Sequence, residues 1–351
     1  MEEQKVPQER SSDEFDTDLE DMEPTNEKPS QSLADMYLKA CGRTGAVEVK
    51  QLLRHQGPSL NLNHYGIGPL GAKALAISLL NDNTITSLEL EDNSLKAEGA
   101  NHVVEMLQSN TQISSLNLSK NDLRLEGAKV LYEMMLHNYC VKCIRLSGNR
   151  FDDACAKYFA EVLKGDYVIR ELDLSLNNFS DAGGEHLGQM LAGNVGIEVL
   201  NLSWNNFSME GAVALCVGLK ANSTLKHLLL VSSGFSSYVA ESLSQALKVN
   251  STLVLLDLSY NLIDDQAVSL LCPGLAGNGT LKVLKLHHNT ITAVGALTLL
   301  KAVKNNPKSA LEDIDISTVV VCKAFMQVLK EVLERFPELV VQYTVLPHVS
   351  V

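Results

Sequence analysis

Apolar and polar positions repeat along most of this chain with a period of 28 residues. Nine segments align without a gap and define repeat units 1–9, and a tenth, incomplete unit follows after two extra residues. In the unit that begins at Ile197, apolar residues occupy the first, fourth and sixth positions, asparagine the ninth and an apolar residue the eleventh. The ten units begin at Gly57, Ile85, Ile113, Val141, Ile169, Ile197, Leu225, Leu253, Leu281 and Leu311.

Each unit predicts one short strand followed by one helix. The alternation in 200–202 places Leu200 and Leu202 on the same side of a strand. Further along the unit, apolar residues recur at helical spacing from Ala212 to Leu219, and the polar Asn222 suits the end of that helix. Because a single unit cannot bury its own apolar side, the units are expected to stack on one another.

Stacking fixes the architecture. Strands stack about 4.8 Å apart, whereas helix axes need roughly 8–10 Å, so the stack must bend. We therefore expect an α/β solenoid in the shape of a horseshoe, with a parallel sheet on the concave face and helices on the convex face. The expected segments are a disordered acidic tail (1–31), an amino-terminal helical cap (32–56), nine repeats (57–310), and an incomplete repeat with a carboxyl cap (311–351).

Asparagine fills the ninth position in seven of the ten units. Its side chain both donates and accepts hydrogen bonds, so at the turn after each strand it can satisfy backbone groups of neighbouring turns. We interpret these residues as a structural ladder, not a catalytic series. The ladder consists of Asn93, Asn121, Asn149, Asn177, Asn205, Asn261 and Asn289, and Ser233 interrupts it inside the array.

These positions carry a family resemblance. The pattern LxxLxLxxNxLxxxGAxxLAxxLxxN, recurring over about four fifths of the chain, resembles the ribonuclease-inhibitor type of leucine-rich repeat. The stretches at 36–56 and 60–76 and the ending at 321–345 resemble the caps of small proteins that consist only of such repeats, and more distantly those of a dynein-regulatory-complex subunit. The resemblance implies a repeat protein with both ends capped against water.

Charge and composition narrow the function. Residues 1–30 carry eleven acids and three bases, so much of the chain's net charge of −13 lies there. We expect neither nucleic acid nor a membrane as a partner, because no basic patch and no long apolar run is present. Without an apolar leader and with an odd number of cysteines, seven, the chain is expected in the cytoplasm, with the nucleus or a cilium left open.

The sequence offers little catalytic chemistry. It contains no GxxxxGK[ST] loop, and its one CxxC, Cys140 and Cys143, lacks the second pair that a structural zinc site needs. We expect no metal, no cofactor and no enzymatic activity. One alternative is a GTPase-activating role through Arg145, which is expected on the concave face, where an ion pair with Asp173 is the simpler interpretation.

The concave surface is the remaining candidate. The third, fifth, seventh and eighth positions of each unit should face it, and units 5–8 place apolar residues there with charges beside them. Such a set is typical of a protein-binding hot spot. The predicted partner-binding residues are Leu176, Val199, Trp204, Leu229, Val231, Leu255 and Tyr260, with Asp173 and Asp257.

Three kinds of function remain open. The first is a non-enzymatic scaffold or adaptor, expected to be a monomer, that binds an unidentified protein through this surface. The alternatives are the GTPase-activating role and a structural part of a ciliary complex, the latter suggested by the distant resemblance of the caps. A covering of the patch by the chain's own acidic tail also stays open.

Overall fold

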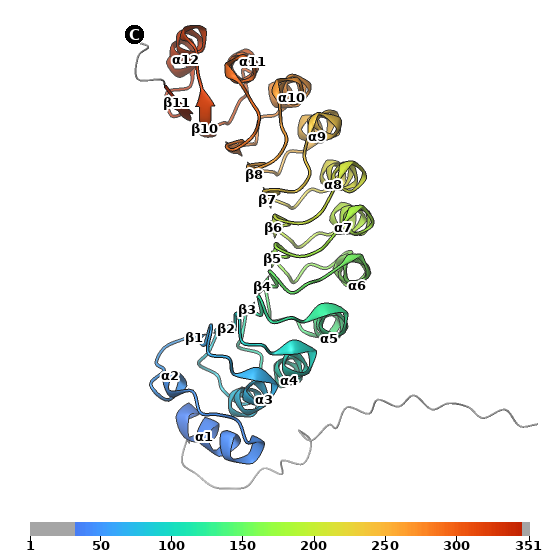
Figure 1. Ribbon diagram of the computed structural model, residues 1–351, viewed down its shortest axis with the longest axis vertical. Coiled ribbons are helices and arrows are strands. Elements are labelled where there is room, and N and C mark those ends of the chain that lie inside the picture. The colour runs from blue at the N-terminus through green and yellow to red at the C-terminus, as the bar shows by residue number, and fades with distance from the viewer. Residues whose placement is uncertain (1–31, 346–351) are drawn as a thin grey trace, which may run out of the picture.

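The computed structural model describes residues 32–345, which form one open arc (Figure 1). A single sheet of eleven strands follows the arc in sequence order from β1 to β11. The strands line the inner side of the arc and the helices its outer side (Figure 1). The predicted horseshoe of parallel strands and helices is confirmed.

The strands of the repeats are short and evenly placed. They are β1 (Ser59–Asn61), β2 (Ser87–Glu89), β3 (Ser115–Asn117), β4 (Cys143–Arg145), β5 (Glu171–Asp173), β6 (Val199–Asn201), β7 (His227–Leu229), β8 (Leu255–Asp257), β9 (Val283–Lys285), β10 (Asp313–Val320) and β11 (Val340–Thr344). Each strand up to β9 therefore covers the third to fifth positions of its unit.

The helix of each complete unit starts at its twelfth or thirteenth position. They are α1 (Leu33–Thr44), α2 (Lys50–Leu53), α3 (Gly68–Leu79), α4 (Lys96–Ser109), α5 (Arg124–His137), α6 (Asp153–Leu163), α7 (Asp181–Gly193), α8 (Met209–Ala221), α9 (Ser237–Val249), α10 (Asp265–Gly277), α11 (Ala293–Asn305) and α12 (Lys323–Arg335). The helix of the sixth unit, α8, ends one residue before Asn222, where the sequence places its end.

Strand pairing keeps the 28-residue register through the repeats. Leu172 lies opposite Leu200, and Leu200 lies opposite Leu228. All three leucines are buried, as are the sixth-position leucines two residues later. The side chains at the third and fifth positions alternate with them and face the inner side of the arc.

Close helix packing completes the core. A Cβ atom added at Gly188 of α7 would lie 2.4 Å from the carbonyl oxygen of Ala214 in α8. This contact is too close for any real side chain, so glycine is required where these helices meet. The backbones of neighbouring units thus touch directly, which makes the array a rigid support for its inner surface.

Both ends of the array are covered within the described residues. Tyr37 of α1 and Leu52 of α2 are buried at the amino-terminal end, and Phe325 of α12 packs edge-on against Tyr343 of β11 at the other. The segment 1–31, predicted as an acidic tail, and residues 346–351 lie outside the described part of the chain.

Candidate functional site

The ninth-position asparagines tie each unit to the preceding one. Asn177 donates from Nδ2 to the carbonyl oxygen of Leu146 at 3.2 Å, and its Oδ1 accepts from the backbone nitrogens of Asn149 and Phe151, both at 3.0 Å. Six of the seven ladder residues are buried, and Asn289 is half-buried. The corresponding Nδ2 bonds of the other six asparagines end on Leu62, Leu90, Leu118, Leu174, Leu230 and Leu258.

The eighth residue of each unit, directly before the ninth-position asparagine or its replacement, has a left-handed backbone in all nine complete units. Trp204 has φ 58°, Tyr260 φ 57° and Leu176 φ 54°, whereas the fourth unit has Gly148, which adopts φ 68° at no steric cost. A non-glycine residue in this region costs about 1–2 kcal/mol. The turn nevertheless holds three bulky apolar side chains and leaves each about half exposed, at 48% for Trp204.

An aromatic cluster joins units 6, 8 and 9. The rings of Trp204 and Tyr260 lie 6.0 Å apart between centroids, and the ring of His288 stacks on Tyr260 at 4.1 Å. His287 meets Tyr260 edge-on at 5.4 Å. Leu262, two residues after Tyr260, is 67% exposed on the same turn. The sequence prediction missed Leu262, although it is the only leucine at the tenth position of any unit.

Beneath the cluster, unit 7 departs from the rules of its neighbours. In six units an Asn or Asp at the fifth position accepts a hydrogen bond from the backbone nitrogen of the seventh. Unit 7 has Leu229 and Val231 at these two positions, and Ser233 at the ninth. Leu229 and Val231 are half-buried and face the inner side of the arc.

The neighbouring unit compensates for part of this loss. Ser203 Oγ, in unit 6, accepts from the backbone nitrogen of Val231 at 3.1 Å. Ser233 Oγ donates to the carbonyl oxygen of Leu202 at 3.2 Å and so retains the donating half of the ladder contact. Unit 7 therefore holds its backbone in place while presenting apolar side chains where other units present polar ones.

The structure brings most of the predicted site residues together. Val199, His227 and Leu255 are consecutive partners across β6, β7 and β8, and Asn201, Leu229 and Asp257 form the next row. Val199 and Leu255 are half-buried. The apolar side chains of these rows lie beside the exposed apolar residues at the eighth position and beside Val231. We call this set the apolar strip: Leu176, Val199, Trp204, Leu229, Val231, Leu255 and Tyr260.

The two predicted rim charges have backbone roles that the sequence reasoning did not foresee. Asp257 is buried, with 7% exposure, and accepts from the backbone nitrogen of Ser259 at 3.0 Å. Asp257, predicted as a charge of the partner-binding surface, thus has its carboxylate turned toward its own turn, and it lies 3.9 Å from Lys285. Asp173 makes the same contact with Ser175 at 2.9 Å but stays half-exposed.

Arg145 is held by two glutamates. Its guanidinium lies 3.4 Å from Glu89 and 3.6 Å from Glu171, not paired with Asp173 as the strand order suggested. Glu91, beside Glu89, pairs with Lys120 at 2.7 Å, and this hydrogen bond is the main reason that the pKa of Glu91 lies below its ordinary value. The acids of unit 2 thus belong to a compensated network of ion pairs.

A second set of acids clamps the starts of consecutive helices. Asp181, the first residue of α7, accepts at 2.8 Å from the backbone nitrogens of both Ser208 and Gly211 in the next unit. Asp153 and Asp265 make equivalent contacts with Gly183 and Gly295. A Cβ at Gly211 would lie 2.8 Å from the Asp181 carboxylate, so the clamp requires glycine opposite it.

The clamp is missing at the joint between units 6 and 7. Met209 occupies the aspartate position of unit 6, and Val239 occupies the glycine position of unit 7. Aspartate occurs at the position of Met209 only in units 4, 5 and 8, so the joint between units 6 and 7 is one of several without the clamp. Val239 replaces the glycine that six of the ten units carry at this position, as do Cys155 in unit 4 and Ala267 in unit 8.

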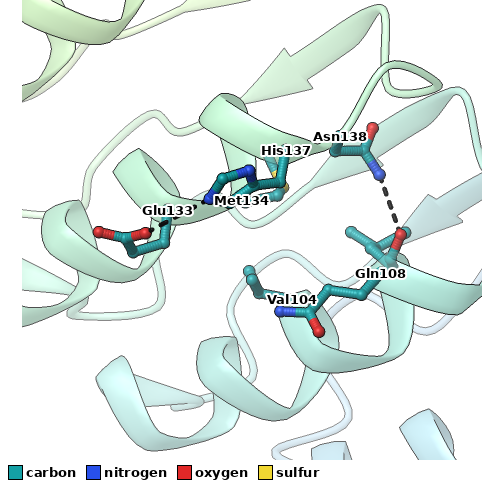
Figure 2. A pocket seen from close by; sticks show the side chains of 7 residues that line it. Val104, Gln108, Glu133, Met134, His137 and Asn138 are labelled. Atoms are coloured by element: carbon teal, nitrogen blue, oxygen red, sulfur yellow. Dashed lines mark hydrogen bonds and ion pairs between the residues drawn. The ribbon is translucent and has the colours of Figure 1, made fainter.

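Other candidate sites offer less chemistry. A pocket of about 330 Å³ lies between α4 and α5, and Figure 2 shows His137 directed toward Glu133, at 4.0 Å, on its rim. Both side chains are mostly exposed. Within residues 32–345, no three His, Cys, Asp or Glu side chains lie close enough to share a metal ion.

The cysteines are unpaired, and burial makes several of them poor nucleophiles. Burial raises the pKa of Cys155 to about 12 and that of Cys272 to about 11. Burial also raises the pKa of Cys143, the strand member of the CxxC pair. Cys140 and Cys143 are both free thiols. No helix among α1–α12 has the length and apolar content to cross a membrane.

Comparison with known proteins agrees with the repeat pattern. A family model described as "Leucine Rich repeat" matches the segments 109–131, 168–188, 196–216, 249–272 and 277–300. Leucine-rich repeat-containing protein 74B of Mus musculus is 50% identical over 52 residues, which is 14% of this chain and 13% of that protein. The aligned segment thus spans only about an eighth of the length of this relative.

Two solved structures resemble the arc in part. One is the actin-binding site 2 of leiomodin-1, with 21% identity, a TM-score of 0.33, and coverage of 36% of this chain and 73% of that one. The other is the leucine-rich-repeat ectodomain of the Arabidopsis receptor kinase HAESA in complex with a peptide hormone, with 18% identity, a TM-score of 0.41, and coverage of 75% and 38%. The 28-residue repeat pattern, the parallel sheet and the matched segments show that the chain folds as a solenoid of leucine-rich repeats.

Proposed function

We propose that this protein is a non-enzymatic binding module that docks a protein partner on the apolar strip of units 5–8. One observation carries the proposal. Unit 7 replaces the polar groups that cap the turn in its neighbours with Leu229 and Val231, and Ser203 of the adjacent unit supplies the missing acceptor. Sequences depart from local structural rules mostly where function requires it.

The strip has the composition of a binding hot spot. Trp204 and Tyr260 are large, rigid side chains in mutual contact and about half exposed, and they flank Leu229 and Val231 in sequence order. Tryptophan and tyrosine dominate the energetics of protein interfaces when they enter a desolvated contact. Their left-handed backbone is shared by the eighth position of every complete unit, so the repeat turn itself sets the direction of both side chains.

The fold suits this role. The strip lies on a sheet whose units are joined by buried asparagines and close helix contacts, so binding needs little ordering of the protein. We propose that the protein acts as a monomer and without a cofactor, as a scaffold or adaptor. Its seven unpaired thiols fit a reducing compartment, and we place it in the cytoplasm.

Site-specific photocrosslinking tests the proposal. A photoreactive phenylalanine analogue is placed at position 204 or at position 217, which is 60% exposed on α8 in the same unit but on the outer side of the arc. We expect one protein to be crosslinked from position 204 and not from position 217. That partner is then purified and its affinity measured by calorimetry.

The affinity of the purified partner for variants of the apolar strip shows whether it binds there. Trp204→Gly and Tyr260→Ser should each weaken the affinity about 30-fold or more, as expected for hot-spot residues. Val217→Ser is the control and should leave it unchanged. Equal crosslinking from both positions, or an affinity indifferent to Trp204 and Tyr260, would show that the partner binds elsewhere.

A further inference from the structure

Acids lie at both ends of strands β5–β10, which carry the apolar strip and the two units that follow it. Along the third position, the register across β5–β10 brings six side chains into one row. The row reads Glu171, Val199, His227, Leu255, Val283 and Asp313. Apolar residues and one histidine thus lie between two carboxylates, and all six side chains are half-buried.

The fifth-position row adds to the negative charge. On the described strands β5–β10, the third and fifth positions hold five acids (Glu171, Asp173, Asp257, Asp313 and Asp315) and a single base, Lys285. Arg145, on β4, shares its one charge between Glu89 and Glu171. The inner face of this half of the arc therefore keeps a net negative charge around an apolar centre.

Further bases of the same units lie just before the strands and are already paired with acids. Lys226 contacts Glu198 at 2.7 Å, and Lys282 contacts Glu312 at 2.7 Å. These residues occupy the second position of their units, directly before the strands, and Lys226 and Lys282 are exposed there. They do not neutralise Glu171 and Asp313.

From this distribution we infer the chemistry of the occupant, an inference that rests on the proposed function. The strip takes a partner segment with an apolar centre and with Lys or Arg on both sides of it. Five strand spacings separate Glu171 from Asp313, a span of about 24 Å. An extended segment of about seven residues covers that distance, with its basic side chains meeting the two carboxylates.

Charge also argues against two other occupants. Residues 1–30 carry eleven acids and three bases, so this segment has the same sign as the ends of the strip. A second copy of the chain would oppose its own acidic row to an identical one. Like charges placed face to face oppose association, and a basic partner segment is the occupant that complements the face.

Synthetic peptides test this on the full chain. The probe is an eight-residue peptide with a Leu-Val-Phe-Leu centre and two arginines at each end. One comparison peptide has glutamate in place of every arginine, and the other has serine in place of the apolar centre. Binding is followed by fluorescence, since Trp204 is the only tryptophan and lies in the strip.

We expect the arginine-flanked peptide to bind at least tenfold more tightly than either comparison peptide in 50 mM salt, with the preference over the glutamate peptide shrinking as salt rises. Glu171→Gln with Asp313→Asn should weaken it about threefold to tenfold. The control, Glu198→Gln with Glu312→Gln, removes the same charge from the paired acids and should have no such effect.

The results separate this inference from the proposed function. Equal binding of the arginine and glutamate peptides, no binding at millimolar concentration, or equal effects of the two double variants would overturn the basic-partner inference. The function proposed for the strip would survive those results if the crosslinked partner still depended on Trp204. Loss of that dependence would overturn the function, whatever the peptides do.

Discussion

The hydroxyl oxygen of Ser203 accepts a hydrogen bond from the backbone nitrogen of Val231 in the next unit, at 3.1 Å. In most units the residue two positions earlier, an asparagine or aspartate, makes this contact instead. Leu229 cannot do so, because it has no acceptor. The contact across the unit boundary is what allows Leu229 and Val231 to face the inner side of the arc without leaving an amide unpaired.

Alanine at two equivalent serines should have opposite effects. Ser203→Ala removes the acceptor of the Val231 amide and should lower the free energy of unfolding by about 1 kcal/mol. Ser259, at the same position of unit 8, is fully buried and its hydroxyl has no partner within the described structure. Ser259→Ala should therefore leave the stability unchanged or raise it by about 1 kcal/mol. Urea unfolding measures both, and a loss at Ser259 as large as that at Ser203 would contradict the hydrogen-bond assignment.

The missing clamp between units 6 and 7 can be installed. Met209→Asp supplies the carboxylate, and Val239→Gly supplies the space that Gly211 gives to Asp181. Each single change should destabilise, since one crowds a carboxylate against Val239 and the other empties a buried site. The double variant should be more stable than the sum of the singles by about 1–2 kcal/mol. A double-mutant cycle by urea unfolding measures this coupling, and strictly additive effects would show that the clamp geometry does not transfer.

Backbone conformation should govern the response to substitution at position 204. Trp204→Gly relieves the left-handed strain but loses the contact with Tyr260, so stability should change by less than about 1 kcal/mol. Trp204→Val loses the same contact and keeps a β-branched residue at positive φ. We expect the free energy of unfolding of Trp204→Val to be about 1–2 kcal/mol lower than that of Trp204→Gly, so that Trp204→Val unfolds at a lower urea concentration. Similar midpoints for the two variants would mean that the turn is not strained there.

The clamp of Asp181 should make stability depend on acid pH. Partial burial raises the pKa of its carboxyl, but hydrogen bonds from the Ser208 side chain and the Gly211 and Ser208 amides outweigh it, and the pKa lies below its ordinary value. The unfolded chain, with an aspartate pKa near 3.9, binds the proton first as pH falls. The stabilisation is thus complete well above pH 4 and is lost as the pH falls through the lower, folded-state pKa.

Asp181→Asn should flatten this dependence. Urea midpoints measured from pH 6 to pH 3 should fall less steeply for the variant than for the natural protein. Glu185→Gln, which changes an exposed acid on the same helix, serves as the control and should keep the natural slope. Identical slopes for all three proteins would remove Asp181 from the groups that govern acid unfolding.

Much of the fold can be predicted from the sequence because the same residue types recur at the same position in almost every unit. Leu200, Leu202 and Asn205 have counterparts in almost every unit, so their burial and pairing are fixed by pattern. The eighth position was expected on the concave surface for the same reason. The roles of Asp257 and Asp181 were not foreseen, because a carboxylate on a turn looks alike whether it faces solvent or an amide. Pairing Asp181 with Gly211 requires the three-dimensional contact across two units.

In the proposed function, unit 7 has apolar residues in place of the polar residues that cap the turn in its neighbours, and these apolar residues contact the partner. The variant Leu229→Asn, Val231→Ser and Ser233→Asn restores the residues that neighbouring units carry at these positions. It should regain the turn cap and the full ladder contact, so its urea midpoint should not fall below that of the natural protein.

The decisive measurement is the calorimetric affinity of this variant for the partner crosslinked at position 204. The account predicts a loss of at least tenfold with no loss of stability. Undiminished affinity in a stably folded variant would contradict it, since unit 7 would then depart from its neighbours without serving the binding surface.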